Sequence, residues 1–342
     1  MIKLNATKCV RSLSRDSECN KCEVICPTNA IVVGSNPLPI IDISACVGCG
    51  ACDAVCPNEA LSLDDFNLVD FFFDFVQEKN AGFISCRKNV PCIAALSVEY
   101  LISIAILKKR VVLDMGHCKS CDIASKCHPQ IIRNYEETSY LLEAMESEAE
   151  IKLQDVCYED KREVKKGNRV LKTSREFEKE VKKATDELIR HTLQKADIAL
   201  LKPKHIPQKR KIFFASLKRV PKPSQYHVVD ATEVTFTSQK FIDKESCTAC
   251  QNCYRACPTG ALTSDMKNSK IDFDPFLCIK CNLCHNLCDS DSITLSTSYN
   301  IKEFFKPTVQ NLISFNVRRC DECNMLFSTN SSDRLCIRCK AK

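Results

Sequence analysis

Cysteine gives this chain most of its possible chemistry, since 26 of the 342 residues are cysteines. Most of them recur at one spacing, C-x2-C-x2-C-x3-C, in which three thiolates from a tight loop can bind one face of a cubic four-iron cluster. The last cysteine is carried away from the loop and can bind a second cluster. Motifs with this spacing therefore come in pairs, and the sequence predicts iron–sulfur sites two at a time.

Four copies of this spacing form two pairs, one in each half of the chain. In chain order, the copies are Cys19, Cys22 and Cys26; Cys46, Cys49, Cys52 and Cys56; Cys247, Cys250, Cys253 and Cys257; and Cys278, Cys281, Cys284 and Cys288. The first copy lacks its first cysteine, and the fourth lacks the proline that follows the last cysteine of the others. Similar tails follow the first three copies: Pro-Thr-Asn-Ala-Ile, Pro-Asn-Glu-Ala-Leu and Pro-Thr-Gly-Ala-Leu.

This repetition resembles that of the two-cluster bacterial ferredoxin family, over residues 1–65 and 240–300. The resemblance implies crossed ligation, in which each cluster takes three cysteines from one motif and the fourth from its partner. It implies four [4Fe-4S] clusters, held by Cys46, Cys49, Cys52 and Cys26; by Cys247, Cys250, Cys253 and Cys288; by Cys278, Cys281, Cys284 and Cys257; and by Cys19, Cys22 and Cys56 with one ligand missing.

The missing ligand has two candidates. The family pattern would place a cysteine at position 16, where this chain has Asp16. Either Asp16 supplies an oxygen ligand, or Cys9 loops back to fill the position. We favour Cys9, because thiolate is the softer ligand and is better suited to an iron–sulfur cluster.

Five more cysteines lie between the two pairs, and the residues around them predict how they are positioned. We expect a short strand at residues 82–85, an apolar helix at 93–107 and a second strand at 111–114. This order favours a parallel strand–helix–strand unit, whose strands end at the edge where open α/β sheets bind ligands. That edge would gather Cys86, Cys92, Cys118, Cys121 and Cys127.

These five residues allow two interpretations. Single buried cysteines are common in apolar cores, whereas five on loops at strand ends favour a fifth iron–sulfur site. Their placement resembles that in the small iron–sulfur subunits that pass electrons between hydrogenases or formate dehydrogenases and their acceptors. The sequence leaves open a four-iron or a two-iron cluster. His128 is adjacent and could bind metal, but we favour a role in helix entry before Pro129.

Residues 158–239 are expected to form a basic linker that is helical at first and is then interrupted by prolines. Residues 158–225 hold 20 basic and 9 acidic side chains. A basic segment of this kind is usually a solvated surface. The functional alternatives are docking to an acidic redox partner or, with less support, to nucleic acid.

The tail carries two C-x2-C pairs separated by twelve residues. This arrangement resembles a zinc ribbon, in which four thiolates hold one structural Zn ion. The proposed zinc ligands are Cys320, Cys323, Cys336 and Cys339. Zinc is favoured over a rubredoxin-type iron because the second pair lacks the proline and glycine usual in rubredoxins, while nearby arginines leave contact with RNA or DNA as an alternative. Cys157 has no assignment.

The elements that would position these cysteines give an α+β chain with five parts. We expect a dicluster ferredoxin module at 1–65, a cysteine-rich α/β domain at 66–157, the linker at 158–239, a second dicluster module at 240–300 and a zinc-ribbon-like tail at 301–342. The apolar stretch at 90–107 contains Pro91 and Glu99, so we expect a buried helix there and no membrane span. Without a recognisable signal peptide, the expected location is cytoplasmic.

The chain shows no glycine-rich nucleotide loop and no Ser-His-Asp or His/Glu metalloprotease pattern. We therefore expect an electron carrier and no enzyme activity of its own. It resembles the polyferredoxin-like proteins of anaerobic or microaerobic respiration, which implies a redox partner such as formate dehydrogenase or another molybdenum oxidoreductase. One alternative is an iron–sulfur sensor that binds nucleic acid through the linker and ribbon. Another is a subunit of an oxidoreductase complex whose active site lies on a different chain.

Overall fold

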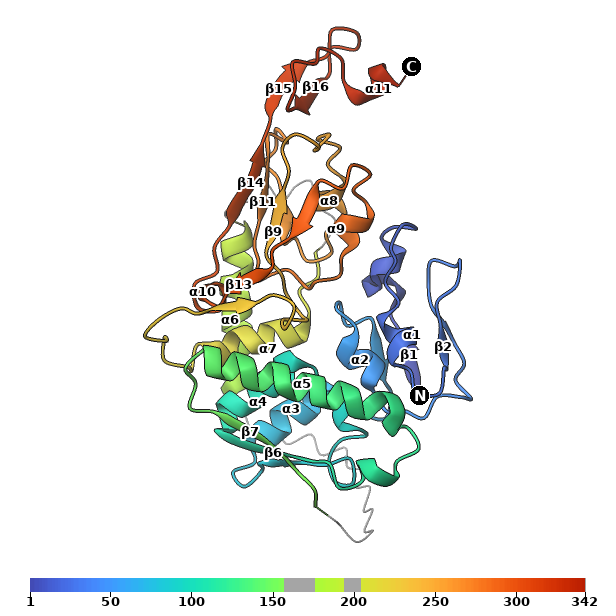
Figure 1. The fold of residues 1–342 in the computed structure, drawn as a ribbon, viewed down its shortest axis with the longest axis vertical. Helices are drawn as coiled ribbons and strands as arrows, with labels where there is room; N and C mark the ends of the chain where they lie inside the picture. Colours follow the sequence, from blue (N-terminus) through green and yellow to red (C-terminus); the bar gives the residue numbers. More distant parts are fainter. Residues whose placement is uncertain (157–175, 194–203, 342) are drawn as a thin grey trace. The chain divides into compact units, whose positions relative to one another are not determined.

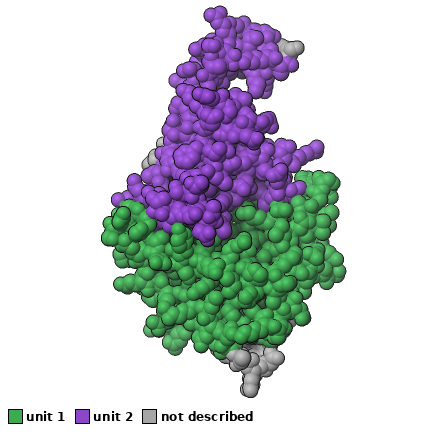
Figure 2. All heavy atoms as spheres, viewed as in Figure 1, with its two compact units in different colours: residues 1–9, 20–186, 207–227 green, residues 10–19, 187–206, 228–342 purple. Residues whose placement is uncertain are grey.

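The computed structural model describes residues 1–156, 176–193 and 204–341 (Figure 1). Cys157 and most of the basic stretch between 158 and 203 lie outside the described residues. The chain divides into two compact units (Figure 2). The first holds residues 1–9, 20–186 and 207–227, and the second holds residues 10–19, 187–206 and 228–342. No helix among the described residues has the length and apolar character needed to cross a membrane.

The N-terminal cysteine module (residues 1–65) uses two short antiparallel ladders. Strand β1 (Ile2–Leu4) pairs with β4 (Leu61–Leu63), and β2 (Ile31–Val32) pairs with β3 (Ile40–Ile41). One short helix lies inside each motif, α1 (Lys21–Ile25) and α2 (Ala51–Val55), and the two helices contact each other. The strand before the first motif therefore pairs with the strand after the second, which brings both motifs together.

The C-terminal cysteine module (residues 240–300) repeats this plan. Strand β9 (Lys240–Ile242) pairs with β12 (Ile293–Leu295), and β10 (Leu262–Thr263) pairs with β11 (Lys270–Phe273). The matching helices, α8 (Asn252–Ala256) and α9 (Leu283–Asn286), also contact each other. The repeat visible in the sequence is thus a repeat of topology as well.

A parallel sheet forms the centre of the cysteine-rich domain. Its strands are β5 (Phe83–Ile84), β6 (Arg110–Asp114) and β7 (Glu150–Gln154), in that order. Helix α4 (Val98–Lys108) connects β5 to β6, which is the strand–helix–strand order expected for residues 82–114. A short 3-10 turn at Ile93–Ala95 precedes α4, so the expected single helix at 93–107 is divided into two pieces.

Helix α4 is buried on nearly all sides, which explains its continuous apolar sequence. Residues Val98 to Ile106 are all buried. The helix contacts α3 (Leu68–Gln77), α5 (Ala124–Ala144), the sheet strand β6 and α7 (Gln208–Leu217). A helix that is apolar all round belongs in a protein core when its neighbours cover every face.

Helix α7 differs from the expectation for this part of the linker. Although three basic residues follow Gln208 in its first turn, eight of its positions are buried, including Lys209 and Arg210. Arg210 donates to the carboxylate of Glu99 on α4 at 2.7 Å, and both side chains are almost fully buried. Phe213 and Leu217 on the same helix are also buried. The paired charge lets this basic segment join the core.

The remaining elements extend the C-terminal module. Strand β13 (Ser298–Asn300) pairs with β8 (Val228–Asp230), and β14 (Gln310–Ser314) adds a third strand beside β11. The hairpin of β15 (Asn316–Arg319) and β16 (Leu326–Thr329) then leads to α11 (Ile337–Lys340). Two further helices are α6 (Glu176–Leu193) and α10 (Lys302–Phe305).

Candidate cluster and metal sites

Three pockets each gather four cysteines. In every case, three cysteines come from one motif and the fourth from the paired motif. The sets are Cys46, Cys49, Cys52 and Cys26; Cys247, Cys250, Cys253 and Cys288; and Cys278, Cys281, Cys284 and Cys257. The structure therefore brings together three of the four groups that the family resemblance implies.

The pockets suit a group that is several atoms across and binds sulfur. Their other lining residues are mostly apolar, such as Ile2 and Leu63 in the first pocket. Burial raises the pKa of Cys284 to about 12, and burial also raises the pKa values of Cys253 and Cys281. Thiols in this setting keep their protons unless a cation replaces them. Sets of four such thiols therefore fit an iron–sulfur cluster, whose irons offset the thiolate charge.

The loop backbone explains how three cysteines can face one pocket. The residues on both sides of the central cysteine adopt left-handed φ values: Gly48 and Gly50, Ala249 and Gln251, and Lys280 and Asn282. Gly50 also lies where a Cβ atom would meet the Ala95 side chain at 2.9 Å. Left-handed conformations cost about 1 kcal/mol or more for most other residues, so three repeats of the pair indicate a shared structural demand.

A buried or capping aspartate begins each of these three loops. Asp42, Asp243 and Asp274 each lie four residues before the first cysteine of a motif. Each carboxylate accepts hydrogen bonds from the backbone amides two and three residues further along the chain. Hydrogen bonds from Ser44 and Ser246 lower the pKa values of Asp42 and Asp243. These turns aim the first cysteine of each motif at its pocket.

The last cysteine of each of the first three motifs accepts a backbone hydrogen bond at sulfur. The amide of Ala30 donates to Cys26 Sγ and that of Ala60 donates to Cys56 Sγ, both at 3.2 Å. The Leu262 amide lies 3.5 Å from Cys257 Sγ. Such N–H donors stabilise negative charge on sulfur, which is one way a protein sets the potential of a cluster.

Three lysines donate to the main chain at these same cysteines, a feature that the sequence analysis missed. Lys209 Nζ lies 2.7 Å from Cys56 O, Lys126 Nζ lies 2.8 Å from Cys26 O, and Lys204 Nζ lies 2.6 Å from Cys257 O. Each cysteine ends a short helix and precedes proline, so the ammonium group meets the negative end of the helix. The lysines are far from these cysteines in sequence, and no local signal predicts the contacts.

The first motif departs from this pattern. Asn20 follows Cys19 as Gly50 follows Cys49. Its φ of −130° lies outside the left-handed region that Gly50 adopts. Cys9, Cys22 and Cys56 belong to the first compact unit, whereas Asp16 and Cys19 belong to the second.

The surroundings of Cys9 and Asp16 differ. Cys9 is buried, and the side chain of Asn58 donates to Lys8 O at 2.7 Å, which ties the Cys9 segment to the turn after Cys56. The Asp16 side chain is exposed and accepts a hydrogen bond from Ser14 Oγ at 3.0 Å. The choice between them as a ligand stays a prediction.

The five cysteines of the middle domain gather near the carboxyl edge of the β5–β6–β7 sheet. Burial raises the pKa of Cys118 to about 12, and the neighbouring thiols of Cys92, Cys86 and Cys121 contribute to the rise. The Cys127 thiol is in hydrogen-bonding contact with the sulfurs of both Cys49 and Cys92, which lowers the pKa of Cys49 to about 7. Cys127 lies within α5, not on a loop ahead of the helix as the sequence suggested.

His128 also lies within α5, which begins at Ala124, so its expected position at the helix entry is wrong by one turn. It lines a surface pocket together with Cys118, Lys119 and Asp155. A metal-binding role for this histidine stays untested.

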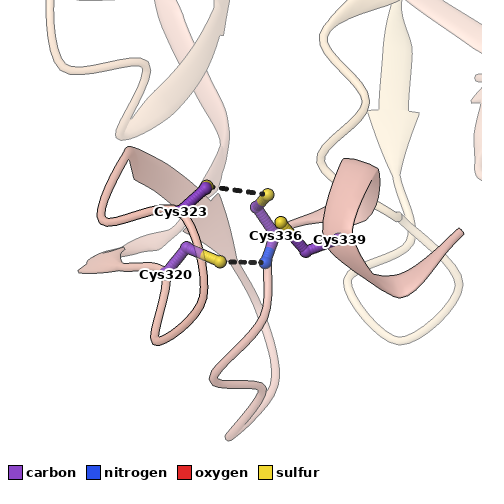
Figure 3. Close-up of side chains that lie close together, drawn as sticks. All are labelled: Cys320, Cys323, Cys336 and Cys339. Carbon is purple, nitrogen blue, oxygen red and sulfur yellow. Dashed lines mark hydrogen bonds between the residues drawn. The ribbon is translucent and has the colours of Figure 1, made fainter. Parts of the chain in front are cut away.

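Four sulfurs meet in the tail. Cys320, Cys323, Cys336 and Cys339 place their sulfur atoms within 4.8 Å of one another (Figure 3). The Cys336 amide donates to Cys320 Sγ at 3.3 Å, and Cys323 Sγ lies 3.7 Å from Cys336 Sγ. Sulfurs around a tetrahedral Zn ion lie about 3.8 Å apart, given Zn–S bonds of about 2.3 Å. The donor set and its spacing therefore fit one Zn ion, whose presence is a prediction.

Comparison with known proteins supports the two modules. Residues 17–61 and residues 239–289 each match a family model described as a 4Fe-4S dicluster domain. The chain contains two such domains. It is also 42% identical over 59 residues to the pyruvate synthase subunit PorD of Methanocaldococcus jannaschii. That match covers 17% of this chain and 66% of the relative, and no solved structure matches the chain.

These matches confirm the expected pair of dicluster ferredoxin modules and their capacity to bind 4Fe-4S clusters. The 25 cysteines of the described residues form no disulfides with one another. Dicluster domains of this kind supply the clusters that electron-transfer proteins use.

Proposed function

We propose that this chain is a multicluster electron carrier that relays single electrons to or from a redox enzyme. The observation that carries the proposal is the crossed grouping of cysteines in three pockets, each lined by four thiols from two motifs. When bound, a [4Fe-4S] cluster can accept one electron and return it without changing any bond to a substrate. The protein then needs only to hold the cluster, set its potential and present it to partners.

The proposed ligands of three clusters are the three pocket sets. For the fourth cluster we propose Cys19, Cys22 and Cys56, as the family resemblance implies, together with Cys9. The hydrogen bond between Asn58 and Lys8 O supports Cys9, because it holds the preceding residue beside the Cys56 turn. The tail is proposed to hold one Zn ion as a structural centre.

The partner in this proposal is an oxidoreductase. The sequence favoured formate dehydrogenase or another molybdenum enzyme of anaerobic respiration, and the partial likeness to a pyruvate synthase subunit adds a second class of oxidoreductase. We also propose a cytoplasmic location, because thiols stay reduced there. In both cases the catalytic site would lie on the partner.

The alternative function is a sensor that binds nucleic acid through basic residues. Fewer of those residues are exposed than the sequence suggested. Lys209 and Arg210 are buried and hydrogen-bonded. Lys182 and Lys183 on α6 are exposed and could meet an acidic partner. Reversing both to glutamate should slow electron transfer to such a partner and flatten its salt dependence. Salt-sensitive duplex binding that the reversal abolishes, in a protein with redox-silent clusters, would favour the sensor instead.

Metal analysis tests the proposal directly. Protein prepared and reconstituted without oxygen should contain at least about sixteen irons with matching sulfide, from four clusters of four irons each, and one zinc. Stepwise reduction should bleach the cluster absorbance reversibly. Eight or fewer irons after full reconstitution would rule out four clusters.

A further inference from the structure

One group of thiols is not used by the two dicluster domains. It lies near the carboxyl ends of β5 and β6, where one buried carboxylate ties three chain segments together. Asp114 Oδ2 accepts from Ser85 Oγ at 2.7 Å, and its Oδ1 accepts from the amides of Gly116 and Val156, each at 3.0 Å. Asp114 is itself only 2% exposed. This junction fixes the ends of β5 and β6 and the segment that follows β7.

The junction also leaves no room for a side chain at its centre. A Cβ atom on Gly116 would lie 2.4 Å from Val156 O, so only glycine fits between the strand end and Cys118. Cys86 directly follows Ser85, and Cys118 follows Gly116 by two residues. The two cysteines are therefore positioned by a rigid, hydrogen-bonded core.

Four of the five middle cysteines form one group. The Cys121 amide lies 3.5 Å from Cys118 O, and the Val90 amide donates to Ser85 O at 3.3 Å. Backbone hydrogen bonds therefore close the turn that carries Cys118 and Cys121, and the turn between Cys86 and Cys92, at the two strand ends that Asp114 holds together. Cys127 lies on α5 next to Lys126, whose ammonium group donates to Cys26 O in the N-terminal module at 2.8 Å. The turn that follows Cys92 meets the Cys49 loop, since a Cβ atom on Gly50 would lie 2.9 Å from the Ala95 side chain. Cys127 is itself only 2% exposed.

We propose that Cys86, Cys92, Cys118 and Cys121 bind a fifth iron–sulfur cluster through four thiolates, and that Cys127 links this site to Cys49. The proposed link through Cys127 depends on the proposed function in one respect, because it assumes that Cys49 binds a cluster of the N-terminal dicluster domain. The fifth site itself rests on the middle-domain residues alone.

Sulfur spacing favours a cluster over a single ion. Among the described residues, the tail cysteines are the group of metal-binding side chains whose ligand atoms all lie within 4.8 Å of one another. The middle thiols do not meet that limit, and neither do the sets that line the three dicluster pockets. Wider spacing suits a group with several irons, and an all-sulfur donor set is selective for soft metals and iron–sulfur clusters. Burial raises the pKa of Cys86, and the nearby positive charge of Arg87 offsets part of that rise.

The contacts of Cys127 give the site a role. One electron that leaves the N-terminal dicluster domain at Cys49 would enter the fifth site at Cys92, with no bond formed or broken and no proton required. The middle domain would then be an additional electron exit, and the strand-end edge would be the surface at which a partner collects the electron.

Iron counting on the full chain tests the fifth site. The double variant Cys86→Ser/Cys118→Ser, reconstituted without oxygen, should lose about four irons for a cubic cluster or about two for a two-iron cluster. Cys157→Ser is a matched control, because it removes a cysteine that belongs to no motif, and it should lose none. Unchanged iron in the double variant, or loss of zinc in place of iron, would overturn the proposal.

Two further measurements cover misfolding and the ligand set. In the intact wild-type protein, alkylation followed by peptide mass spectrometry should find Cys86, Cys92, Cys118 and Cys121 protected until iron is chelated. Reaction of all four without chelation would overturn the site. Cys127→Ala should keep the wild-type iron content while Cys92→Ala loses one cluster, and the reverse result would overturn the assignment of Cys127 as a link. Failure of the dicluster proposal would appear separately, as missing iron in every variant including the wild type.

Discussion

The ammonium group of Lys209 lies 2.7 Å from the main-chain oxygen of Cys56, so a cation from α7 reaches the turn that holds a proposed cluster ligand. The same lysine lies 3.3 Å from Ala54 O at the end of α2. Lys126 and Lys204 make the equivalent contacts at Cys26 and Cys257. Three cations thus occupy the same position around three repeats of one motif.

Removing this cation should make reduction of the nearby cluster harder. Reduction adds negative charge, which a neighbouring ammonium group stabilises. We expect Lys209→Met to lower the midpoint potential of a cluster by about 40 mV, which corresponds to about 1 kcal/mol for one electron. Redox titration followed by EPR measures the shift. Lys209→Arg should keep the wild-type potential, as should Lys222→Met, which removes an exposed lysine; a Lys209→Met protein with an unshifted potential would contradict the charge effect.

The incomplete first motif gives a second prediction. If Cys9 completes the cluster, Cys9→Ser should produce a cluster that loses iron and gives a three-iron EPR signal on oxidation. Asp16→Ala should retain the intact cluster, because the Asp16 side chain is exposed and already hydrogen-bonded to Ser14. The opposite pattern would identify Asp16 as the ligand.

The buried pair of Glu99 and Arg210 gives a third prediction, on stability. Arg210→Met leaves the Glu99 carboxylate buried near Lys209, its remaining cationic neighbour at 4.0 Å. Breaking a buried ion pair on one side typically costs about 3–5 kcal/mol. In the Arg210→Met protein, the loss of stability should appear as faster hydrogen exchange of the α4 amides. The double variant Glu99→Leu/Arg210→Met should recover much of the loss, and equal effects of the single and double changes would contradict it.

Acid should weaken the loop that begins at Asp243. A hydrogen bond from the Ser246 side chain, with smaller contributions from amide donors, lowers the pKa of this carboxyl below its ordinary value of 3.8. Because the folded pKa is lower than the unfolded one, the stabilisation is present above 3.8 and is lost as the pH falls through the folded value. We expect Asp243→Asn to reduce the pH dependence of folding in that acid range, measured by circular dichroism of the metal-free protein. A wild-type pH profile in this variant would show that the carboxylate makes no difference.

Local spacing predicted much of the candidate site, and long-range packing supplied the rest. The motif around Cys46 carries its own ligand geometry in its spacing, so its pocket could be expected without any knowledge of the fold. Lys209 and Cys56 are 153 residues apart, and nothing near either residue indicates their contact. The burial of α7 was missed for a related reason, because the basic residues Lys209, Arg210 and Lys211 and the prolines around them suggested a solvated linker. The partner of Arg210 lies on α4, more than a hundred residues earlier.

The C-terminal dicluster domain depends on residues beyond its last cysteine motif. Strand β14 forms the outer edge of its sheet beside β11, and the side chain of Asn330 donates to Cys247 O and Lys244 O, each at 2.9 Å. A fragment excised at residue 300 would keep all eight cysteines of that domain and lose both supports. Its β11 edge would then be open to pairing with other chains. Any minimal domain made for biophysical work should therefore extend through Asn330, and its boundaries should follow hydrogen bonds and not the cysteine motifs.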